Sequence, residues 1–573
     1  MSGKQTTALI VCVFLFVAQV FGEKQNKPGK RRCISPATVS KFLQSNQKVQ
    51  TQKLHSQATQ VGNIVVLEAN PELLILENVF DLHHFTIRFY PVSKGRYGHT
   101  LELANFDGTA SRTLDLGDDE SYELVFKHFH FPFSRTTYDR CYINSNGTIT
   151  FETPDSEVPT ADGLTPNIPR IAGFFADLNP ETSGTIFLHE TSERVIVSWL
   201  KVPEFFNQNQ FDFGQNTFQI VLYKTGVIDL VYTDEFTATQ GFVGLIPGTD
   251  SVPLRFVDFS SRKSSHRQLH SFVENFHDYV SADIRNLMKS LYAGIPDDFD
   301  FISLFSNFDL TPVPGAQAFA INVQNNVRGI GNPSDKKPIF KDNEKYGSSK
   351  RLQNITFFGN IHQYPSDPSS RLPEDDVSLL DILAHEVGHR WLSYVKLLKH
   401  GAETDVLLGR DKSHWSFFLD SDASYLEGNQ ISNRSTDSFE TARPFQRYSD
   451  LDLYLMGLKS PEEVLETYYV EGASNFSPEF PFTAEASPED NVTFNGLAVP
   501  VRVEDIIEAN GSRRPSITGS QKDFRHLFVL VVRAGQIPTA EELAFLELVR
   551  SSWSDLFYNA TYGKATINTV LEQ

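Results

Sequence analysis

The stretch Leu379-Leu-Asp-Ile-Leu-Ala-His-Glu-Val-Gly-His-Arg-Trp-Leu-Ser-Tyr-Val395 carries the motif His385-Glu386-x-x-His389 within a helical pattern. Residues four apart lie on one face of a helix, so both imidazoles can reach one metal ion, with Glu386 beside it. The spacing therefore predicts a zinc site, in which zinc lowers the pKa of a water molecule and Glu386 acts as its general base.

The ends of this helix are also indicated by the sequence. Ser378 followed by Asp381 is the pattern of a capping box at the first turn. Lys396 and Lys399, followed by Gly401, are typical of a last turn, where cations meet free carbonyls and glycine takes the left-handed position. A chance match is the alternative, because the chain has 16 histidines, but the helical context favours a zinc site.

A catalytic zinc ion takes three protein ligands, so one ligand is still to be found beyond the helix. His414 is our prediction, because imidazole suits zinc beside two histidines and the 25 residues after His389 let a loop return. The alternative for His414 is a surface histidine stacked on Trp415. Asp452 is the second choice, either as a ligand or as the partner of a ligand histidine. The full set of candidates considered is His400, Glu403, His414, Asp420, Asp422, Glu427, Asp450 and Asp452.

The composition indicates a soluble chain with more than one domain. It has 573 residues, of which 40% are hydrophobic and 21% charged, with a formal net charge of −20. This acidity argues against nucleic acid as a partner. Residues 1–22 are typical of a signal peptide, and no later stretch is apolar enough to span a membrane. Residues 23–62 are predicted to be a leader or linker, in which Lys30-Arg-Arg32 is either a flexible stretch or a processing site.

Glycosylation signals and cysteines agree with a secreted protein. Two cysteines follow the predicted signal peptide, Cys33 and Cys141, and they form either one disulfide or two free thiols. Seven Asn-x-Ser/Thr triplets weakly favour an extracellular surface. They begin at Asn146, Asn354, Asn433, Asn475, Asn491, Asn510 and Asn559.

Short β-branched and aromatic runs between turn residues predict an all-β domain over residues 63–259. Its clearest hairpin is Tyr142 to Phe151, turning at Asn146-Gly147. His128 and His130 would share a strand face, either as a metal pair or as two solvent-facing side chains. Further strands are expected at Gly184 to Glu190, Val195 to Val202, Thr217 to Lys224 and Val227 to Tyr232.

A polar stretch without apolar periodicity, residues 260–269, predicts a linker to a second domain at residues 270–573. Mixed periodicity there indicates helices together with strands. The expected elements are a helix from His277 to Tyr292, strands at Phe299 to Phe308, Ala318 to Gln324 and Leu527 to Val532, and a helix that opens at Thr539 with Glu542 as its capping partner.

Roughly residues 90–248 resemble the nidogen-type extracellular β-domain. The resemblance rests on Phe131-Pro-Phe133, Tyr142-Ile-Asn-Ser-Asn-Gly147, Ile171-Ala-Gly-Phe-Phe-Ala-Asp177 and Asn216-Thr-Phe-Gln-Ile-Val221. It implies an extracellular module that could contact a matrix or cell-surface partner, without fixing a ligand.

The motif of the opening stretch resembles that of the zincin metallopeptidases, over roughly residues 270–573. Trp391, His414-Trp415 and Leu455-Met-Gly457 look like a secreted branch of that superfamily. The chain departs from the metzincin pattern, since Leu392 and Val395 stand where a glycine and a third histidine would follow.

Together the two resemblances imply a multidomain fold: an N-terminal all-β, sandwich-like domain, then an α+β zincin-like metallopeptidase domain. The expected function is that of a secreted endopeptidase that hydrolyses peptide bonds of a protein or peptide substrate, with Zn²⁺ as cofactor. Its metal ligands would be His385, His389 and His414, and its base Glu386. The alternative is an extracellular matrix or adhesion protein with a silent metallopeptidase-like domain. A structural zinc site is disfavoured, because it normally needs four ligands, often cysteines.

Overall fold

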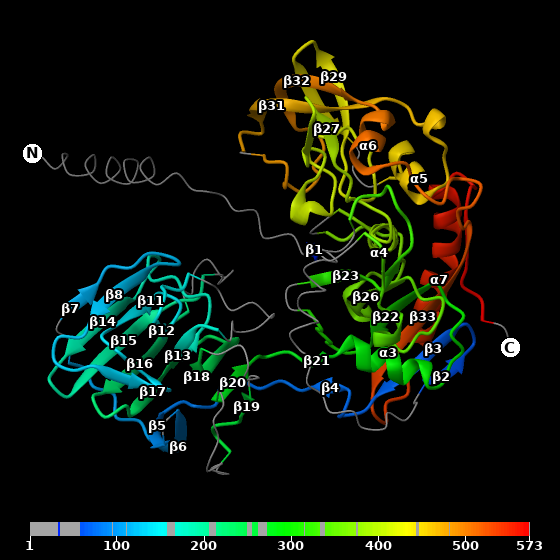
Figure 1. Ribbon diagram of the computed structural model, residues 1–573. Coiled ribbons are helices and arrows are strands. Elements are labelled where there is room, and N and C mark those ends of the chain that lie inside the picture. The colour runs from blue at the N-terminus through cyan, green and yellow to red at the C-terminus, as the bar shows by residue number, and fades with distance from the viewer. Residues whose placement is uncertain are drawn as a thin grey trace, which may run out of the picture.

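The computed structural model describes residues 32–34, 58–93, 95–109, 112–156, 167–205, 214–248, 255–261, 272–313, 316–332, 338–373, 376–442, 446–480 and 482–571. The predicted signal peptide and most of the predicted leader lie outside these ranges. Most of the regular structure is strand, and Figure 1 shows a β-rich unit beside a unit in which helices pack on a sheet.

The β-rich unit confirms the predicted N-terminal β-domain. Its two sheets enclose one core rich in phenylalanine. The first sheet has the order β19(Arg255–Phe256), β20(Phe272–Phe276), β18(Gly241–Pro247), β13(Pro169–Phe175), β12(Thr148–Thr150), β11(Arg140–Asn144) and β8(Ser121–Val125). The second sheet has the order β6(Arg96–Leu103), β5(Phe85–Ser93), β17(Ile228–Phe236), β16(Asn216–Tyr223), β15(Arg194–Val202), β14(Thr185–Glu190) and β7(Arg112–Leu114). A separate two-stranded sheet consists of β9(Phe131–Phe133) and β10(Thr136–Tyr138).

The predicted hairpin is present, with β11 antiparallel to β12. Gly147 has φ +77°, and a Cβ there would lie 2.0 Å from the carbonyl oxygen of Phe174, so the turn requires glycine. Asn146 holds the same turn from its side chain, which donates to Asp119 and accepts from the backbone N–H of Leu178. The turn residues therefore fix the hairpin against the neighbouring loops.

Cys141 lies in β11 with a free thiol that is fully buried in this core. Burial raises the pKa of the thiol well above its usual range. The strand that contains Cys33, β1(Arg32–Ile34), pairs with a strand of the other unit, and the Cys33 side chain lies outside the described residues. Of the two predicted alternatives, the state of Cys141 agrees with a free thiol.

The linker predicted at residues 260–269 does not separate two domains. Residues 262–269 lie outside the described ranges, but β19 before them and β20 after them are neighbouring strands of one sheet. The sandwich therefore continues past residue 260, to β20. A cut in this stretch would fall within the sandwich, so we expect no folded β fragment that ends at residue 260.

The predicted domain start at residue 63 also needs correction. β2(Ala58–Val61) pairs with β3(Ile64–Ala69), and β3 runs parallel to β33(Asp523–Arg533) in the second unit, with Ile64 opposite Phe528. The sandwich is thus inserted into the second unit. Its entry and exit are tied together, because β4(Leu74–Ile75) pairs with β21(Ser281–Ala282).

The sheet of the second unit confirms the three predicted strands. Its order is β1, β23(Ala316–Asn322), β26(Asn354–Asn360), β22(Phe301–Ser306), β33, β3 and β2, with β34(Thr566–Asn568) beside β33. Strands β26, β22, β33 and β3 are parallel, and β23 is antiparallel to β26. Alternate residues of these strands face two separate cores.

Each face of the sheet is covered by helices (Figure 1). Helix α3(Ile284–Tyr292) packs on one face, and α4(Leu379–Gly388) and α7(Ala540–Ala560) on the other. Helix α7 opens with the predicted Thr539–Glu542 capping box. Helix α3 is shorter than the predicted 277–292, because Asp283 caps it and the residues before it pair as β21.

A smaller four-stranded sheet with its own phenylalanine-rich core lies beyond α4. Its order is β29(Gln430–Ser435), β30(Ser438–Ala442), β32(Thr493–Val501) and β31(Thr467–Ser477). The remaining elements are α5(Asp450–Met456), α6(Val503–Asn510), the hairpins β24(Gln324–Asn325)/β25(Phe340–Lys341) and β27(Leu397–Lys399)/β28(Ala402–Thr404), and 3₁₀ turns at Asn343–Tyr346, Ile361–Gln363, Arg410–Lys412 and Pro461–Glu463.

Candidate metal centre

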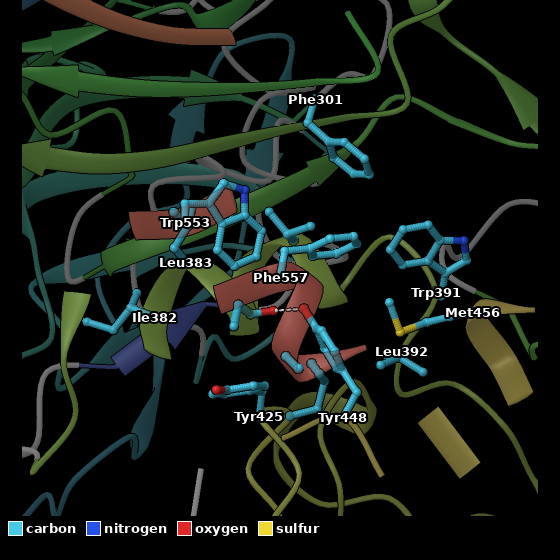
Figure 2. Close-up of a cluster of buried hydrophobic side chains, with 14 of the residues drawn as sticks. Phe301, Ile382, Leu383, Trp391, Leu392, Tyr425, Tyr448, Met456, Trp553 and Phe557 are labelled. Carbon is cyan, nitrogen blue, oxygen red and sulfur yellow. Dashed lines mark hydrogen bonds between the residues drawn. The ribbon is translucent and has the colours of Figure 1, made fainter. Parts of the chain in front are cut away.

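Helix α4 begins as the sequence predicts. The Ser378 side chain accepts from the backbone N–H of Asp381, and the Asp381 carboxylate accepts from Ser378, which completes the capping box. Figure 2 shows the buried side chains around the helix, with Leu383 near Trp553 of α7. The hydroxyl of Tyr448 donates to the carbonyl oxygen of Ala384 at 2.7 Å, inside the helix (dashed in Figure 2). The helix is thus held on several sides.

The helix ends earlier than predicted, at Gly388, with His389 as its cap. Asn322 of β23 and the hydroxyl of Tyr394 each donate to the His389 carbonyl oxygen at 2.7 Å. These two donors satisfy a terminal carbonyl that would otherwise need another helical turn. The basic residues expected in a last turn lie instead near the hairpin β27/β28, whose turn holds Gly401.

Gly388 allows a second loop to reach the helix. A Cβ at this position would lie 2.6 Å from Cδ2 of Leu426, so a larger residue would have to displace the Leu426 side chain. The neighbouring carbonyl oxygen of Tyr425 then accepts from Nδ1 of His385 at 2.7 Å. The small residue inside the motif therefore leaves room for the loop that orients its first histidine.

Each of three histidines donates Nδ1–H to a backbone carbonyl. His385 donates to Tyr425 as above, His389 donates to Leu392 at 3.1 Å and His414 donates to Arg410 at 2.8 Å. A carbonyl oxygen only accepts, so Nδ1 carries the proton in all three rings. In a neutral ring Nε2 then carries a lone pair instead of a hydrogen, which is the form that binds a metal ion.

The three Nε2 atoms converge. Nε2 of His385 lies 3.1 Å from Nε2 of His389 and 3.3 Å from Nε2 of His414, and all three atoms lie within 4.8 Å of one another. Two nitrogens bound to one tetrahedral zinc ion, each at about 2.0–2.1 Å, are about 3.3 Å apart. Lone pairs facing each other at this distance repel unless a cation lies between them. The donor set therefore fits a divalent metal ion, and it includes the histidine predicted as third ligand.

The surroundings keep these rings neutral. His389 and His414 are fully buried, and His385 is 3% exposed. Burial lowers the pKa of His385 to about 4, against the smaller opposing effect of Glu427. Burial, reinforced by nearby positive groups, holds the pKa values of His389 and His414 well below 6.5. The rings are thus in their neutral form, with a single ring proton, at neutral pH.

Glu386 follows His385 on α4 and is also fully buried. Burial and, to a smaller extent, the charge of Glu386 raise the pKa of Tyr394, whose hydroxyl donates to the His389 carbonyl oxygen. Helix α4 and its cap therefore carry a buried carboxylate together with two of the three converging histidines.

Arg410 and Glu427 also adjoin the histidines. Nη2 of Arg410 donates to Nε2 of His414 at 3.2 Å, so the guanidinium would have to move off this lone pair for a metal ion to bind there. The same guanidinium forms an ion pair with Glu427. Oε1 of Glu427 is 3.9 Å from the same Nε2 atom. From the sequence, Glu427 was predicted only as a candidate ligand. Arg410 was not predicted, because its place four residues before His414 is the single signal for it in the sequence.

Asp452 does not join the three histidines. Its carboxylate accepts from Nε1 of Trp415 at 2.9 Å and from the hydroxyl of Ser424 at 2.7 Å. It thereby holds the residue next to His414, which is an indirect role. The other candidates point elsewhere: His400 lies in the β27/β28 turn, Glu403 pairs with Lys396, Asp422 with Arg447 and Asp450 with Lys459, and Asp420 accepts from the backbone of Ile431.

The sandwich contains two further groups of possible metal ligands, a pair of histidines and a cluster of aspartates. His128 and His130 are exposed and lie outside any strand, as solvent-facing side chains. Asp118, Asp119 and Asp177 gather carboxylate oxygens within 4.8 Å of one another, and burial is the main reason why the pKa of Asp177 rises to about 6. This acidic cluster was not predicted from the sequence, because its members come from loops that are far apart in the chain.

The comparisons with known proteins bear on the sandwich. Residues 96–271 match the model of a family described as NIDO related. The matched range extends through the stretch that was predicted to be a linker, in agreement with the pairing of β19 and β20. No curated protein and no solved structure matches the chain. The chain therefore contains a nidogen-related domain, inserted into a unit that carries the histidine cluster.

Proposed function

We propose that the chain is a secreted zinc-dependent endopeptidase, with His385, His389 and His414 as the metal ligands and Glu386 as the general base. One observation carries the proposal: three buried imidazoles, each fixed through Nδ1, direct Nε2 to one point, and the helix and cap that carry the first two also carry the buried Glu386. Three protein ligands leave a position open, as catalytic rather than structural zinc sites do. A zinc ion held there would supply a Lewis acid and lower the pKa of a water molecule.

The residues of the chain supply the rest of the chemistry. Glu386 takes the proton of the attacking water, and the same carboxyl group then gives it to the nitrogen of the departing amine. The three backbone carbonyls hold the rings so that Nε2 does not have to be reorganised when substrate arrives. The packing around α4 keeps this arrangement rigid.

An extracellular location for the chain agrees with the nidogen-related domain, which is typical of extracellular proteins. No helix in the described part of the chain is both long and apolar enough to cross a membrane. The predicted glycosylation sites differ in solvent exposure. The asparagines at 433, 475, 491 and 559 are exposed, whereas Asn146 and Asn354 are buried and their side-chain amides are hydrogen-bonded. We propose that the sandwich contacts a matrix or cell-surface partner.

The purified chain should digest casein or gelatin in a zinc-dependent way. Treatment with 1,10-phenanthroline should abolish cleavage, because neutral imidazoles release the metal to a strong chelator, and one equivalent of zinc should restore it. Gel electrophoresis of the digest provides the measurement. A chain that binds zinc but cleaves no substrate, before or after removal of its first 32 residues, would favour the adhesion protein instead.

A further inference from the structure

A buried ion pair lies directly against the histidine cluster. Arg410 and Glu427 are 9% and 8% exposed. Nη2 of Arg410 contacts both Oε1 of Glu427 and Nε2 of His414, and Nε of Arg410 donates to Oε2 of Glu427 at 3.2 Å. One positive and one negative charge are thus placed at the atoms that would hold a metal ion.

Burial of the Arg410–Glu427 pair costs free energy of folding, because both charges lose their contact with water. Removing two charges from water is unfavourable unless their geometry is good, and a hydrophobic pair would often be as stable. Glu427 also has φ +62°, and Asp422 and Ala423 in the same loop have φ +53° and +59°. Left-handed non-glycine residues gather at functional sites, where the surrounding structure enforces them. Stability alone therefore does not account for the pair.

The positive charge of Arg410 opposes metal binding unless a nearby negative charge neutralises it. A guanidinium a few ångströms from a divalent cation repels it strongly in a buried site. Glu427 is the buried counter-ion of that charge, whereas Asp411 contacts Nη1 of Arg410 at 3.6 Å from an exposed position. Arg410 engages both carboxylate oxygens of Glu427, so Glu427 is better placed as a counter-ion than as a ligand. Arg410 also accepts Nδ1–H of His414 at its carbonyl oxygen, which couples the pair to the third histidine.

We propose that Arg410 and Glu427 act as one unit: Arg410 donates to the carbonyl oxygen of the scissile bond, and Glu427 cancels its charge so that the histidines can hold zinc. As the water oxygen bonds to the carbonyl carbon, the electron pair of the C=O bond moves onto its oxygen. The guanidinium N–H groups stabilise the negative charge that develops there. This inference rests on the proposed peptidase function.

A double-mutant cycle on the full chain tests the unit. Zinc affinity is measured by competition with a chelating dye, and casein cleavage by kcat and KM. Glu427→Gln should weaken zinc binding by about 10- to 100-fold, because Arg410 loses its buried counter-ion and keeps only the exposed Asp411. Arg410→Met should leave zinc affinity at least as high as in the wild type, but lower kcat by on the order of 10². The double variant, Arg410→Met with Glu427→Gln, should bind zinc more tightly than Glu427→Gln alone. Its kcat should stay as low as that of Arg410→Met.

Glu440→Gln is the matched control, since it breaks the Arg434–Glu440 pair in the separate four-stranded sheet and should change neither quantity. A double variant that binds zinc as weakly as Glu427→Gln would make Glu427 a ligand and overturn the proposal. Unchanged zinc affinity in Glu427→Gln, or unchanged kcat in Arg410→Met, would overturn it as well. Wild-type chain that binds zinc without cleaving protein would refute the peptidase function and the donor role, while the affinity cycle would still test the counter-ion.

Thermal unfolding in EDTA shows whether each variant is folded. Glu427→Asp is the substitute if Glu427→Gln does not fold, because it keeps the charge one methylene farther from Arg410. It should weaken zinc binding by less than Glu427→Gln would, and Arg410→Met should remove that loss. A loss that persists in the Arg410→Met background would contradict the counter-ion role.

Discussion

Glu386→Gln is expected to retain zinc and to lose peptide hydrolysis by on the order of 10² or more. The amide has nearly the shape of the carboxylate but cannot take the proton of the attacking water. Because Glu386 is fully buried beside His385 on α4, the isosteric change avoids a cavity. Casein cleavage rates together with zinc content, measured on the same preparations, separate chemistry from metal loss.

Glu403→Gln serves as the control, because Glu403 is exposed in β28 and pairs with Lys396 away from the histidines. It should cleave casein at the wild-type rate. Equal activity in the Glu386 variant would remove this residue from the mechanism. A Glu386 variant that had lost its zinc would instead show that the carboxylate stabilises the metal site.

His414→Ala is expected to lower zinc affinity by on the order of 10³ or more. It removes one of three converging Nε2 atoms, which costs more than the roughly 10- to 100-fold effect of an indirect partner. Removal of this ring also leaves the nearby Arg410–Glu427 pair without its neighbour. Bound zinc after dialysis against a buffered zinc solution provides the measurement.

Asp452→Asn is the comparison for His414→Ala. The amide oxygen can still accept from Trp415, although the hydrogen bonds from Ser424 and from the Ser449 backbone are weakened. We expect a loss of zinc affinity of about tenfold or less, since Asp452 acts only through the position of Trp415. A larger loss in this variant than in His414→Ala would reverse the assignment of the third ligand.

The sequence was sufficient for the local parts of the site. A capping box needs two residues three apart, and a metal pair needs two histidines four apart, so Ser378, Asp381, His385 and His389 could all be located from spacing alone. The turn at Gly147 was predictable for the same reason, since the left-handed conformation has few alternatives to glycine.

The pairing of strands that are far apart in the chain could not be predicted from the sequence. Ile64 and Phe528 are opposite each other in one sheet although more than four hundred residues separate them, and periodicity carries no information about which strands pair. A polar stretch between β19 and β20 has the composition of a linker whether it joins domains or two strands of one sheet. Both domain boundaries were misplaced for this reason.

The end of α4 was predicted too late in the chain, because a glycine after basic residues is typical both of a helix end and of a hairpin turn. Gly401 takes the left-handed conformation, as expected, but with His400 it forms the turn of the β27/β28 hairpin, where both residues have positive φ. The true end is set by donors from Asn322 and Tyr394 to His389. Contacts between side chains from separate elements, including the Arg410–Glu427 pair, leave no periodic pattern in the sequence.

X-ray absorption at the zinc edge of the purified wild-type chain tests the central claim most directly. We predict one zinc ion per chain with three imidazole nitrogens at about 2.0–2.1 Å and one further light ligand, and the loss of one imidazole in His414→Ala. A chain that binds no zinc at buffered micromolar metal, or zinc bound through sulfur, would contradict the account.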